Sequence, residues 1–222
     1  MGKLCFVGVG PGNKKYLTQE ALDAIQSSSC FIAFSRVAQD FYDHPHLVEV
    51  SSLEELVSSI AAFDDSQDIL VGVSGSVNFH SSADYLMKKF PKKEFEFIQG
   101  ISSLDYLSAK IPIKTNDFVR LSAHGKTLET SQVIDALKHH EYLGLLLDKE
   151  HTASSIAQLL CLQGFEDIEL YIGENLSYDD EKISHIRAKD AAHMSFHPLS
   201  NMILRSPFSK DQREATRSYH FG

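Results

Sequence analysis

The chain has 222 residues, 43% hydrophobic and 23% charged, which excludes a disordered chain and allows one or two domains with a buried core. Its formal net charge of −9 opposes general binding to nucleic acid, because clustered lysines and arginines supply most phosphate affinity. The apolar run at residues 4–9 is broken by Gly10, Pro11 and Gly12, well short of the roughly 20 residues of a membrane span. We therefore expect a cytoplasmic protein with neither a membrane anchor nor a signal peptide.

Short strand-like runs alternate with helical stretches through the first half of the chain. This alternation predicts βαβ units and a mostly parallel sheet. The run Ile69–Val73 is apolar on both alternating faces, as expected for a central strand covered by helices on both sides. In chain order, the expected strands are 4–9, 30–34, 47–50, 69–74 and 94–98, and the expected helices are 18–28, 36–42, 53–63, 79–90 and 102–110.

The pattern restarts after a break at residues 111–117. Pro112 and the Asn116-Asp117 pair favour a turn there, so we place a domain boundary after residue 112. We predict a fold of two α/β domains, 1–112 and 113–206, each with a mostly parallel or mixed sheet flanked by helices. Residues 207–222 are polar without clear periodicity and are predicted to be a tail. In the second domain, strands are expected at 118–122, 142–147, 168–172 and 202–205, and helices at 129–139 and 152–162.

The stretch GVGPGN, residues 8–13, lies between the first strand and the first helix. A dinucleotide site needs Gly-x-Gly-x-x-Gly and an acid about 20 residues later. Gly8 and Gly10 fit, but Asn13 replaces the third glycine and the second strand ends without a carboxylate. Pro11 has no N–H to offer a phosphate, and no Gly-Lys-Ser/Thr of a P-loop follows. These residues favour either a plain tight turn or a ligand held against the main chain.

Two further loops have a similar position. Residues 74–76, Ser-Gly-Ser, follow the central strand, and residues 100–103, Gly-Ile-Ser-Ser, follow the next strand and open a helix. In open α/β sheets, ligands collect at the carboxyl ends of the strands. Three such loops on one edge favour a ligand pocket over three unrelated turns.

The order of these motifs resembles the tetrapyrrole methylases over most of residues 2–205. Within that family, the opening loop, the QGISS stretch followed by His124-Gly125, and GENLSYDDEKI most resemble the branch that methylates C5 of cobalt-precorrin-7 in cobalamin biosynthesis. The stretches that carry the resemblance are VGVGPGNKKYLTQEAL (7–22), VSGS (73–76), QGISS (99–103), LDKEHTASSIAQLL (147–160), IGENLSYDDEKI (172–183) and PLSNMIL (198–204).

The resemblance implies a ligand cleft between two α/β domains, S-adenosylmethionine as methyl donor, a small tetrapyrrole substrate and a homodimer. It also implies which residues contact the donor. Family members usually show Gly-Asp-Pro where this chain has Gly75, Ser76 and Val77, so a negative charge that could attract the cationic donor is missing. The implied donor contacts are Pro11, Ser74, Gly75, Ser76, Phe79, Ser102, Ser103, Asp148, Asn175 and Leu176.

Methyl transfer from a sulfonium to carbon needs donor and acceptor held in line in a dry site, and no activated nucleophile. The resemblance implies that an electron-rich carbon of the tetrapyrrole attacks, so we assign no catalytic residue. His124 corresponds to the family's substrate-side loop and is a candidate substrate contact. Lys14 and His80 are candidates, by position, for binding substrate carboxylates. We expect no metal, because adjacent His139 and His140 diverge by about 100° on a helix.

Other functions stay open. A methylase of the same family can act on a protein or RNA, as diphthine synthases and ribosomal RNA methylases do, although the acidic charge disfavours RNA. Ser76 also makes a non-catalytic protein that binds adenosylmethionine or a tetrapyrrole conceivable. A nucleotide-dependent oxidoreductase is disfavoured by the missing third glycine and the missing ribose acid.

Overall fold

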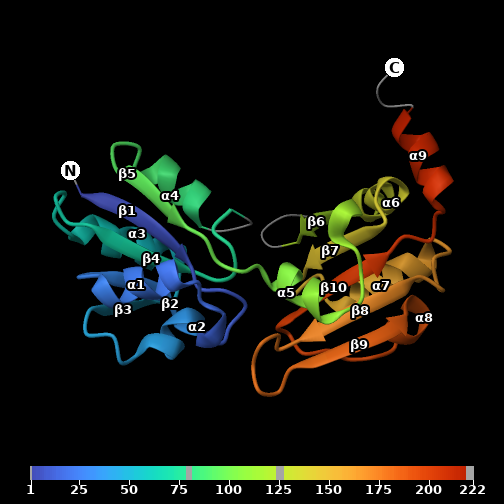
Figure 1. Cartoon of the computed structure of the whole chain (residues 1–222), viewed down its shortest axis with the longest axis horizontal. Coiled ribbons are helices and arrows are strands. Elements are labelled where there is room, and N and C mark those ends of the chain that lie inside the picture. The colour runs from blue at the N-terminus through green and yellow to red at the C-terminus, as the bar shows by residue number, and fades with distance from the viewer. Residues whose placement is uncertain (1, 79–81, 124–127, 219–222) are drawn as a thin grey trace. The chain divides into compact units, whose positions relative to one another are not determined.

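The computed structural model describes residues 2–78, 82–123 and 128–218 (Figure 1). The chain divides into two compact units, 1–103 and 104–222, each built on a five-stranded sheet. Over the described ranges, no helix combines the length and the apolar character needed to cross a bilayer. The predicted fold class is confirmed, with one parallel sheet and one mixed sheet, each accompanied by helices.

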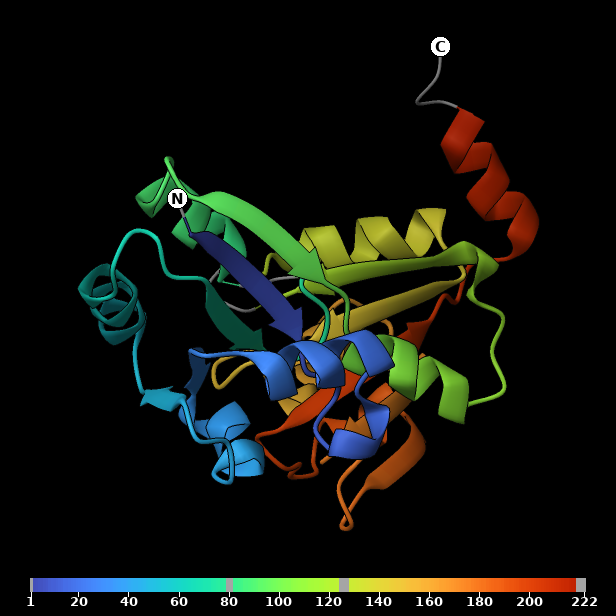
Figure 2. The ribbon, with the colours of Figure 1, turned by 60° about the vertical axis from the view of Figure 1, so that its left-hand side comes forward.

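The first sheet is parallel throughout, in the order β3-β2-β4-β1-β5. Its middle strand is β4, and all of its residues are buried, as predicted for the apolar run. The neighbouring arrows of β1 and β5 lie side by side in Figures 1 and 2. The strands are β1 (Lys3–Gly8), β2 (Phe31–Phe34), β3 (Leu47–Val50), β4 (Ile69–Val73) and β5 (Glu94–Ile98).

Helices cover both faces of this sheet. Leu56 and Ile60 of α3 pack into the core on one face, and Ala21 and Ile25 of α1 into the core on the other. Side chains at the helix starts cap free N–H groups, as Thr18 does for the amide of Ala21. The helices are α1 (Gln19–Ser27), α2 (Ser35–Ala38), α3 (Leu53–Ala62) and α4 (Ala83–Lys89), with the short 3₁₀ turns η1 (Lys14–Tyr16) and η2 (Gln39–Phe41).

The second sheet is mixed, in the order β6-β7-β10-β8-β9. Strands β6 and β7 pair in parallel, whereas β10 is antiparallel to both β7 and β8. The edge strand β9 was not predicted, because its residues are polar and mostly exposed or half-buried. The strands are β6 (Phe118–Ser122), β7 (Tyr142–Leu146), β8 (Glu169–Glu174), β9 (Lys182–Arg187) and β10 (Ser200–Arg205).

A large apolar core lies between one face of the second sheet and helices α6, α7 and α8. Leu137 of α6 and Leu160 of α7 are almost fully buried there. The helices of this unit are α5 (Ser103–Lys110), α6 (Thr130–His139), α7 (Ala153–Leu162), α8 (Ala188–Ala191) and α9 (Lys210–Ser218), with the 3₁₀ turn η3 (Thr115–Asp117).

The division between the units falls after Ser103, ahead of the boundary predicted at residue 112. The reason is the packing of α5. A Cβ on Gly144 of β7 would lie 3.0 Å from Leu104, and one on Gly173 of β8 would lie 3.0 Å from Leu107. Because these glycines admit the leucines onto the second sheet, α5 belongs to the second unit.

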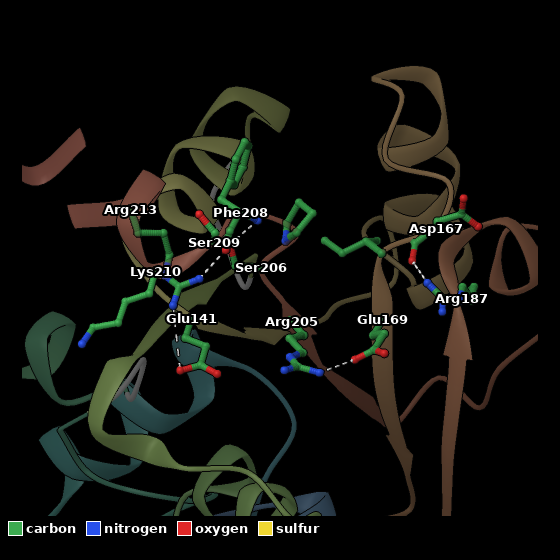
Figure 3. A pocket seen from close by; sticks show the side chains of 12 residues that line it. Glu141, Asp167, Glu169, Arg187, Arg205, Ser206, Phe208, Ser209, Lys210 and Arg213 are labelled. Carbon is green, nitrogen blue, oxygen red and sulfur yellow. Dashed lines mark hydrogen bonds and ion pairs between the residues drawn. The ribbon is translucent and has the colours of Figure 1, made fainter. Parts of the chain in front are cut away.

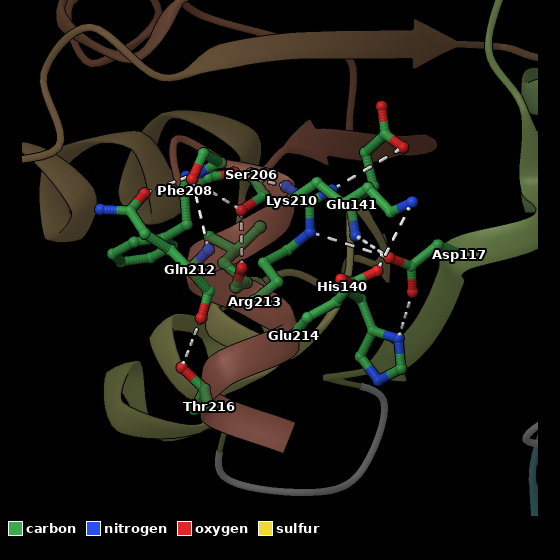
Figure 4. A network of polar contacts seen from close by, with 12 residues as sticks. Asp117, His140, Glu141, Ser206, Phe208, Lys210, Gln212, Arg213, Glu214 and Thr216 are labelled. Carbon is green, nitrogen blue, oxygen red and sulfur yellow. Dashed lines mark hydrogen bonds and ion pairs between the residues drawn. The ribbon is translucent and has the colours of Figure 1, made fainter. Parts of the chain in front are cut away.

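The segment predicted to be a polar tail contains a helix, α9. Ser209 and Gln212 exchange side-chain and main-chain hydrogen bonds at its start, which is a capping box. Arg213 is 7% exposed, lies 3.8 Å from Asp117 and 3.9 Å from Glu141, and donates to the Phe208 carbonyl (Figure 4). The helix lacks an apolar stripe because its buried anchor is a charged side chain.

Candidate functional site

Three loops leave the first sheet at the same edge. Strand β1 lies between β4 and β5, with Gly8 beside Val73 and Val7 beside Ile98. The three parallel strands therefore end at nearly the same level, and the loops that follow them lie side by side. This is the carboxyl edge at which the sequence predicted a pocket.

Main chain packs directly on main chain where these loops meet. A Cβ on Gly100 would lie 2.3 Å from the carbonyl oxygen of Gly75 and 2.5 Å from the carbonyl carbon of Gly8. Real Cβ atoms do not approach backbone this closely, so only glycine fits at position 100. The three loops thus meet through a surface of backbone atoms.

Hydrogen bonds join the first loop to the second. The N–H of Gly75 donates to the carbonyl of Gly10 at 2.9 Å, and the N–H of Gly10 donates back to the carbonyl of Gly75 at 3.3 Å. Gly75 has φ +72°, a conformation that residues with a Cβ rarely adopt. Pro11, next to this bridge, is buried.

Gln99 fastens the second loop to the third, a role that the sequence analysis did not assign. Its side-chain oxygen accepts from the Ser76 hydroxyl at 3.0 Å and from the Gly100 N–H at 3.2 Å. Its main-chain carbonyl accepts from the Thr18 hydroxyl at 3.2 Å. The signal in the sequence is a polar residue directly before the glycine of the third loop. Ser76 stands where the family has aspartate, and here it belongs to this network.

Two serines at this edge differ in exposure. Ser74 is exposed, and its oxygen accepts a hydrogen bond from the guanidinium of Arg36 at 2.5 Å. Ser102 is only 5% exposed, and its Cα lies 3.9 Å from where a Cβ on Gly75 would stand. Ser103, the next residue, begins α5. Arg36, which lies on α2 directly after β2, was not among the predicted site residues.

In the second unit, Asp148 and Asn175 follow strands that end at one edge. Strands β7 and β8 both run antiparallel to β10, so they share a direction. Leu146 of β7 pairs with Asn201 and Glu174 of β8 pairs with Ser200, which places both strand ends beside the start of β10. The two loops therefore lie on the same side of their sheet.

The carboxylate of Asp148 organises its own turn. One oxygen accepts the N–H of Glu150 at 2.9 Å and that of His151 at 2.7 Å, and lies 3.0 Å from Nδ1 of His151. Burial alone would raise the pKa of Asp148, but these hydrogen bonds from His151 and Glu150 outweigh it and lower the pKa. The carboxylate is therefore ionised, and the hydrogen bonds it accepts come from its own loop.

The Glu-Asn loop, residues 174–181, is also held by carboxylates. The side-chain amide of Asn175, whose φ is 46°, donates to Asp180 at 2.7 Å. Glu181 accepts the N–H of Ser177 at 2.7 Å and lies 3.5 Å from the ammonium of Lys110. Burial would raise the pKa of Glu181, but hydrogen bonds from Tyr106 and Ser177 and the charge of Lys110 lower it.

Leu176 and Glu174 of this loop are both buried. Leu176 is 3% exposed and covers Gly173, where a Cβ would lie 2.5 Å from its side chain. Glu174 is 8% exposed, accepts the N–H of His197 at 2.8 Å and lies 3.3 Å from the ammonium of Lys182. Sequence reasoning assigned no role to Glu174, although a carboxylate at the end of an apolar run was a visible signal.

The predicted residues therefore form two groups. Pro11, Ser74, Gly75, Ser76 and Ser102 gather at one edge of the first sheet, with Ser103 following, whereas Asp148, Asn175 and Leu176 gather at one edge of the second. Phe79, His80 and His124 lie outside the described residues. Lys14 is near Asp43, 3.5 Å away, and above the ring of Phe41. In the described parts of the chain, no group of three or more His, Cys, Asp or Glu side chains is arranged to hold a metal ion.

A cavity of about 620 Å³ lies at the opposite end of the second sheet (Figure 3). Its lining includes several charged side chains, which bond one another or the main chain. Arg205 lies 3.2 Å from Glu169, Arg187 donates to the Asp167 carbonyl, and Arg213 approaches Glu141. None of the predicted site residues lines it.

The family model for tetrapyrrole (corrin/porphyrin) methylases matches residues 3–192. The chain belongs to the tetrapyrrole methylase family. One relative is the probable cobalt-precorrin-7 C(5)-methyltransferase of Methanocaldococcus jannaschii, 26% identical over 201 residues, or 87% of this chain and 93% of that protein. This methylase chain thus spans nearly the whole length of that relative.

Solved structures share the fold of this tetrapyrrole methylase. The precorrin-6Y methylase of Archaeoglobus fulgidus, a cobalamin biosynthesis protein, superposes with a TM-score of 0.74 at 14% identity, covering 94% of this chain and 100% of that one. The uroporphyrin-III C-methyltransferase of Thermus thermophilus, solved with S-adenosyl homocysteine, gives a TM-score of 0.73 at 19% identity and covers 92% of each chain.

Proposed function

We propose that this protein is an S-adenosylmethionine-dependent C-methyltransferase that methylates C5 of cobalt-precorrin-7 in cobalamin biosynthesis. The observation that carries the proposal is the backbone surface at the edge of the first sheet, in a chain of the tetrapyrrole methylase family. The name of the Methanocaldococcus jannaschii relative supports the substrate. The neighbour solved with S-adenosyl homocysteine supports the donor.

The first-sheet edge suits this donor chemically. Pro11 cannot donate an N–H, whereas the carbonyl of Gly75 and the hydroxyl of Ser76 are oxygens that favour a cationic ligand. We assign Pro11, Ser74, Gly75, Ser76, Ser102 and Ser103 to donor binding, together with Phe79. In the second unit, we assign Asp148, Asn175 and Leu176 to donor binding as well. Substituting each of them separately tests its contribution.

When bound, S-adenosylmethionine supplies an electrophilic methyl group whose bond to sulfur breaks as the ring carbon forms the new carbon–carbon bond. The residues of the chain are needed to bind donor and substrate, to align the methyl group with the ring carbon and to exclude water. The fixed backbone around Gly100 is suited to this task, because it has no side-chain rotamers to order when the ligand binds. His124 remains a proposed substrate contact.

Calorimetry with S-adenosylhomocysteine and with NAD tests the donor. We expect micromolar binding of S-adenosylhomocysteine only, and binding of NAD alone would exclude a methylase. Incubation with cobalt-precorrin-7 and S-adenosylmethionine, followed by mass spectrometry, should show one added methyl group. Donor binding without turnover would instead favour a protein or RNA acceptor, or a sensor. A cytoplasmic homodimer, tested by cell fractionation and light scattering, is part of the proposal.

A further inference from the structure

The guanidinium of Arg36 stands at the carboxyl edge of the first sheet, beside the loop that follows β4. Strand β2 lies on the far side of β4 from β1, and α2 begins directly after it. Arg36 is exposed on α2, and its Nη2 donates to the hydroxyl of Ser74 at 2.5 Å. Through this hydrogen bond, a cation from the second βα connection reaches the loop that follows β4.

Two other exposed arginines pair with carboxylates. Arg120 pairs with Asp105, and Arg205 lies 3.2 Å from Glu169. For Arg36, no carboxylate of the described residues lies within 4.0 Å. Its described side-chain partner, the hydroxyl of Ser74, is neutral. A guanidinium has five N–H donors, so one bond to a hydroxyl leaves most of its capacity for a ligand.

A second cation lies in the same neighbourhood. Burial raises the pKa of Asp40 on η2, and the charges of Lys14 and Arg36 both oppose that rise, which places Asp40 within reach of both. Lys14 itself lies 3.5 Å from Asp43. Asp40 and Asp43 thus balance part of the positive charge of Lys14 and Arg36. Of these two cations, Lys14 has a carboxylate of the described residues in direct contact, whereas Arg36 does not.

We propose that Arg36 is a specificity-determining residue that binds a carboxylate side chain of the tetrapyrrole substrate. This rests on the proposed function, because the corrin precursors are polycarboxylates. A chain with net charge −9 repels such a substrate unless local cations oppose the repulsion. The planar guanidinium binds a carboxylate through two parallel hydrogen bonds, which the Ser74 hydroxyl orients.

The test uses two stable corrins that differ in their side chains. Cobyrinic acid carries free carboxylates, whereas cobinamide carries amides. We expect Arg36→Gln to weaken the binding of cobyrinic acid by about 10- to 100-fold, as for losing hydrogen bonds to a charged group. Arg36→Lys should recover part of the loss. The binding of cobinamide should be the same for Arg36→Gln and the wild type. Arg205→Gln is the matched control, because it removes an exposed arginine in the second unit.

S-adenosylhomocysteine binding is measured in parallel, because that ligand also has a carboxylate. If the Arg36→Gln variant binds S-adenosylhomocysteine as the wild type does, the proposal is supported. Loss of S-adenosylhomocysteine with cobyrinic acid retained would assign the guanidinium to the donor and overturn it, as would failure of the wild type to bind cobyrinic acid. If the wild type binds no S-adenosylhomocysteine yet loses cobyrinic acid on Arg36→Gln, the methylase proposal fails and the carboxylate site stands.

Discussion

The candidate loops of the two units keep their shape by different means. In the first unit, backbone lies against backbone at Gly8, Gly75 and Gly100, and main-chain hydrogen bonds join the loops. In the second unit, carboxylates hold the loops by accepting main-chain N–H groups, as Asp148 and Glu181 do. The first arrangement depends on the absence of side chains, and the second depends on charged ones.

This difference has consequences for stability. Close backbone contact tolerates no added atom, but it is indifferent to pH because no titratable group takes part. A loop held by a carboxylate tolerates changes in side-chain size nearby, but it loses its hydrogen bonds when the carboxylate is removed or protonated. Four substitutions or conditions separate the two arrangements.

The largest expected effect comes from Gly100→Ala. The added Cβ would lie 2.3 Å from the Gly75 carbonyl oxygen, so the loops must move apart. We expect a loss of about 3 kcal/mol in unfolding free energy and weakened S-adenosylhomocysteine binding. Denaturant unfolding and calorimetry measure the two effects. Gly164→Ala is the matched control, because its φ of +81° costs about 1 kcal/mol but no atom lies within 4 Å. Wild-type binding by Gly100→Ala would contradict the role of backbone contact.

The next effect comes from Glu174→Ala in the second unit. This change leaves the N–H of His197 and the ammonium of Lys182 without their carboxylate. We expect a loss of about 1–3 kcal/mol in unfolding free energy, because the main chain at His197 loses a hydrogen bond to a carboxylate that is 8% exposed. Glu169→Ala, which removes a pair with exposed Arg205, should cost less than about 1 kcal/mol. Equal losses for the two variants would show that burial of Glu174 has no special role.

Acid should loosen the second unit's loops before those of the first. The folded-state pKa values of Asp148 and Glu181 lie below their ordinary values of 3.8 and 4.5. Their stabilisation is therefore fully present above those ordinary values and is lost as the pH falls through the lowered ones. Hydrogen exchange, corrected for intrinsic rates, should show segments 148–152 and 174–182 losing protection while 74–76 and 99–102 keep theirs. The same response in Asp148→Asn/Glu181→Gln would contradict this assignment.

The smallest effect is expected for Ser76→Asp, which restores the family's carboxylate. A negative charge within about 4 Å of the sulfonium contributes about 1 kcal/mol in a water-like medium. S-adenosylmethionine should therefore bind about fivefold more tightly relative to S-adenosylhomocysteine, whose sulfur carries no charge. Ser76→Asn matches the shape without the charge and should leave this ratio unchanged. An equal gain for both ligands would assign the effect to shape.

Much of the first unit could be predicted locally. The runs that became β3 and β5 were predicted with the observed bounds, because turns on both sides limit each apolar run. The grouping of the three glycine loops also followed from the sequence, since parallel strands connected by helices must present their carboxyl ends together. The resemblance to tetrapyrrole methylases rested on those loops together with stretches of the second unit, and the family model confirms it.

The missed features are those stabilised by distant polar partners. Strand β9 has no continuous apolar face, and α9 is held by Arg213 reaching Asp117 and Glu141, far back in the chain. The boundary at Ser103 depended on glycines of β7 and β8, which admit leucines of α5 onto the second sheet. None of these partners is visible in a local window of sequence.

The sequence by itself determined the alternation of strands and helices, the parallel first sheet, and the loops whose glycines meet at its edge. Periodicity and glycine placement are local properties, so they can be read without the fold. Only the tertiary structure decided that Gln99 joins two loops and that Arg36 faces Ser74. A side-chain hydrogen bond depends on the position of its partner, and that position exists only once the strands are assembled.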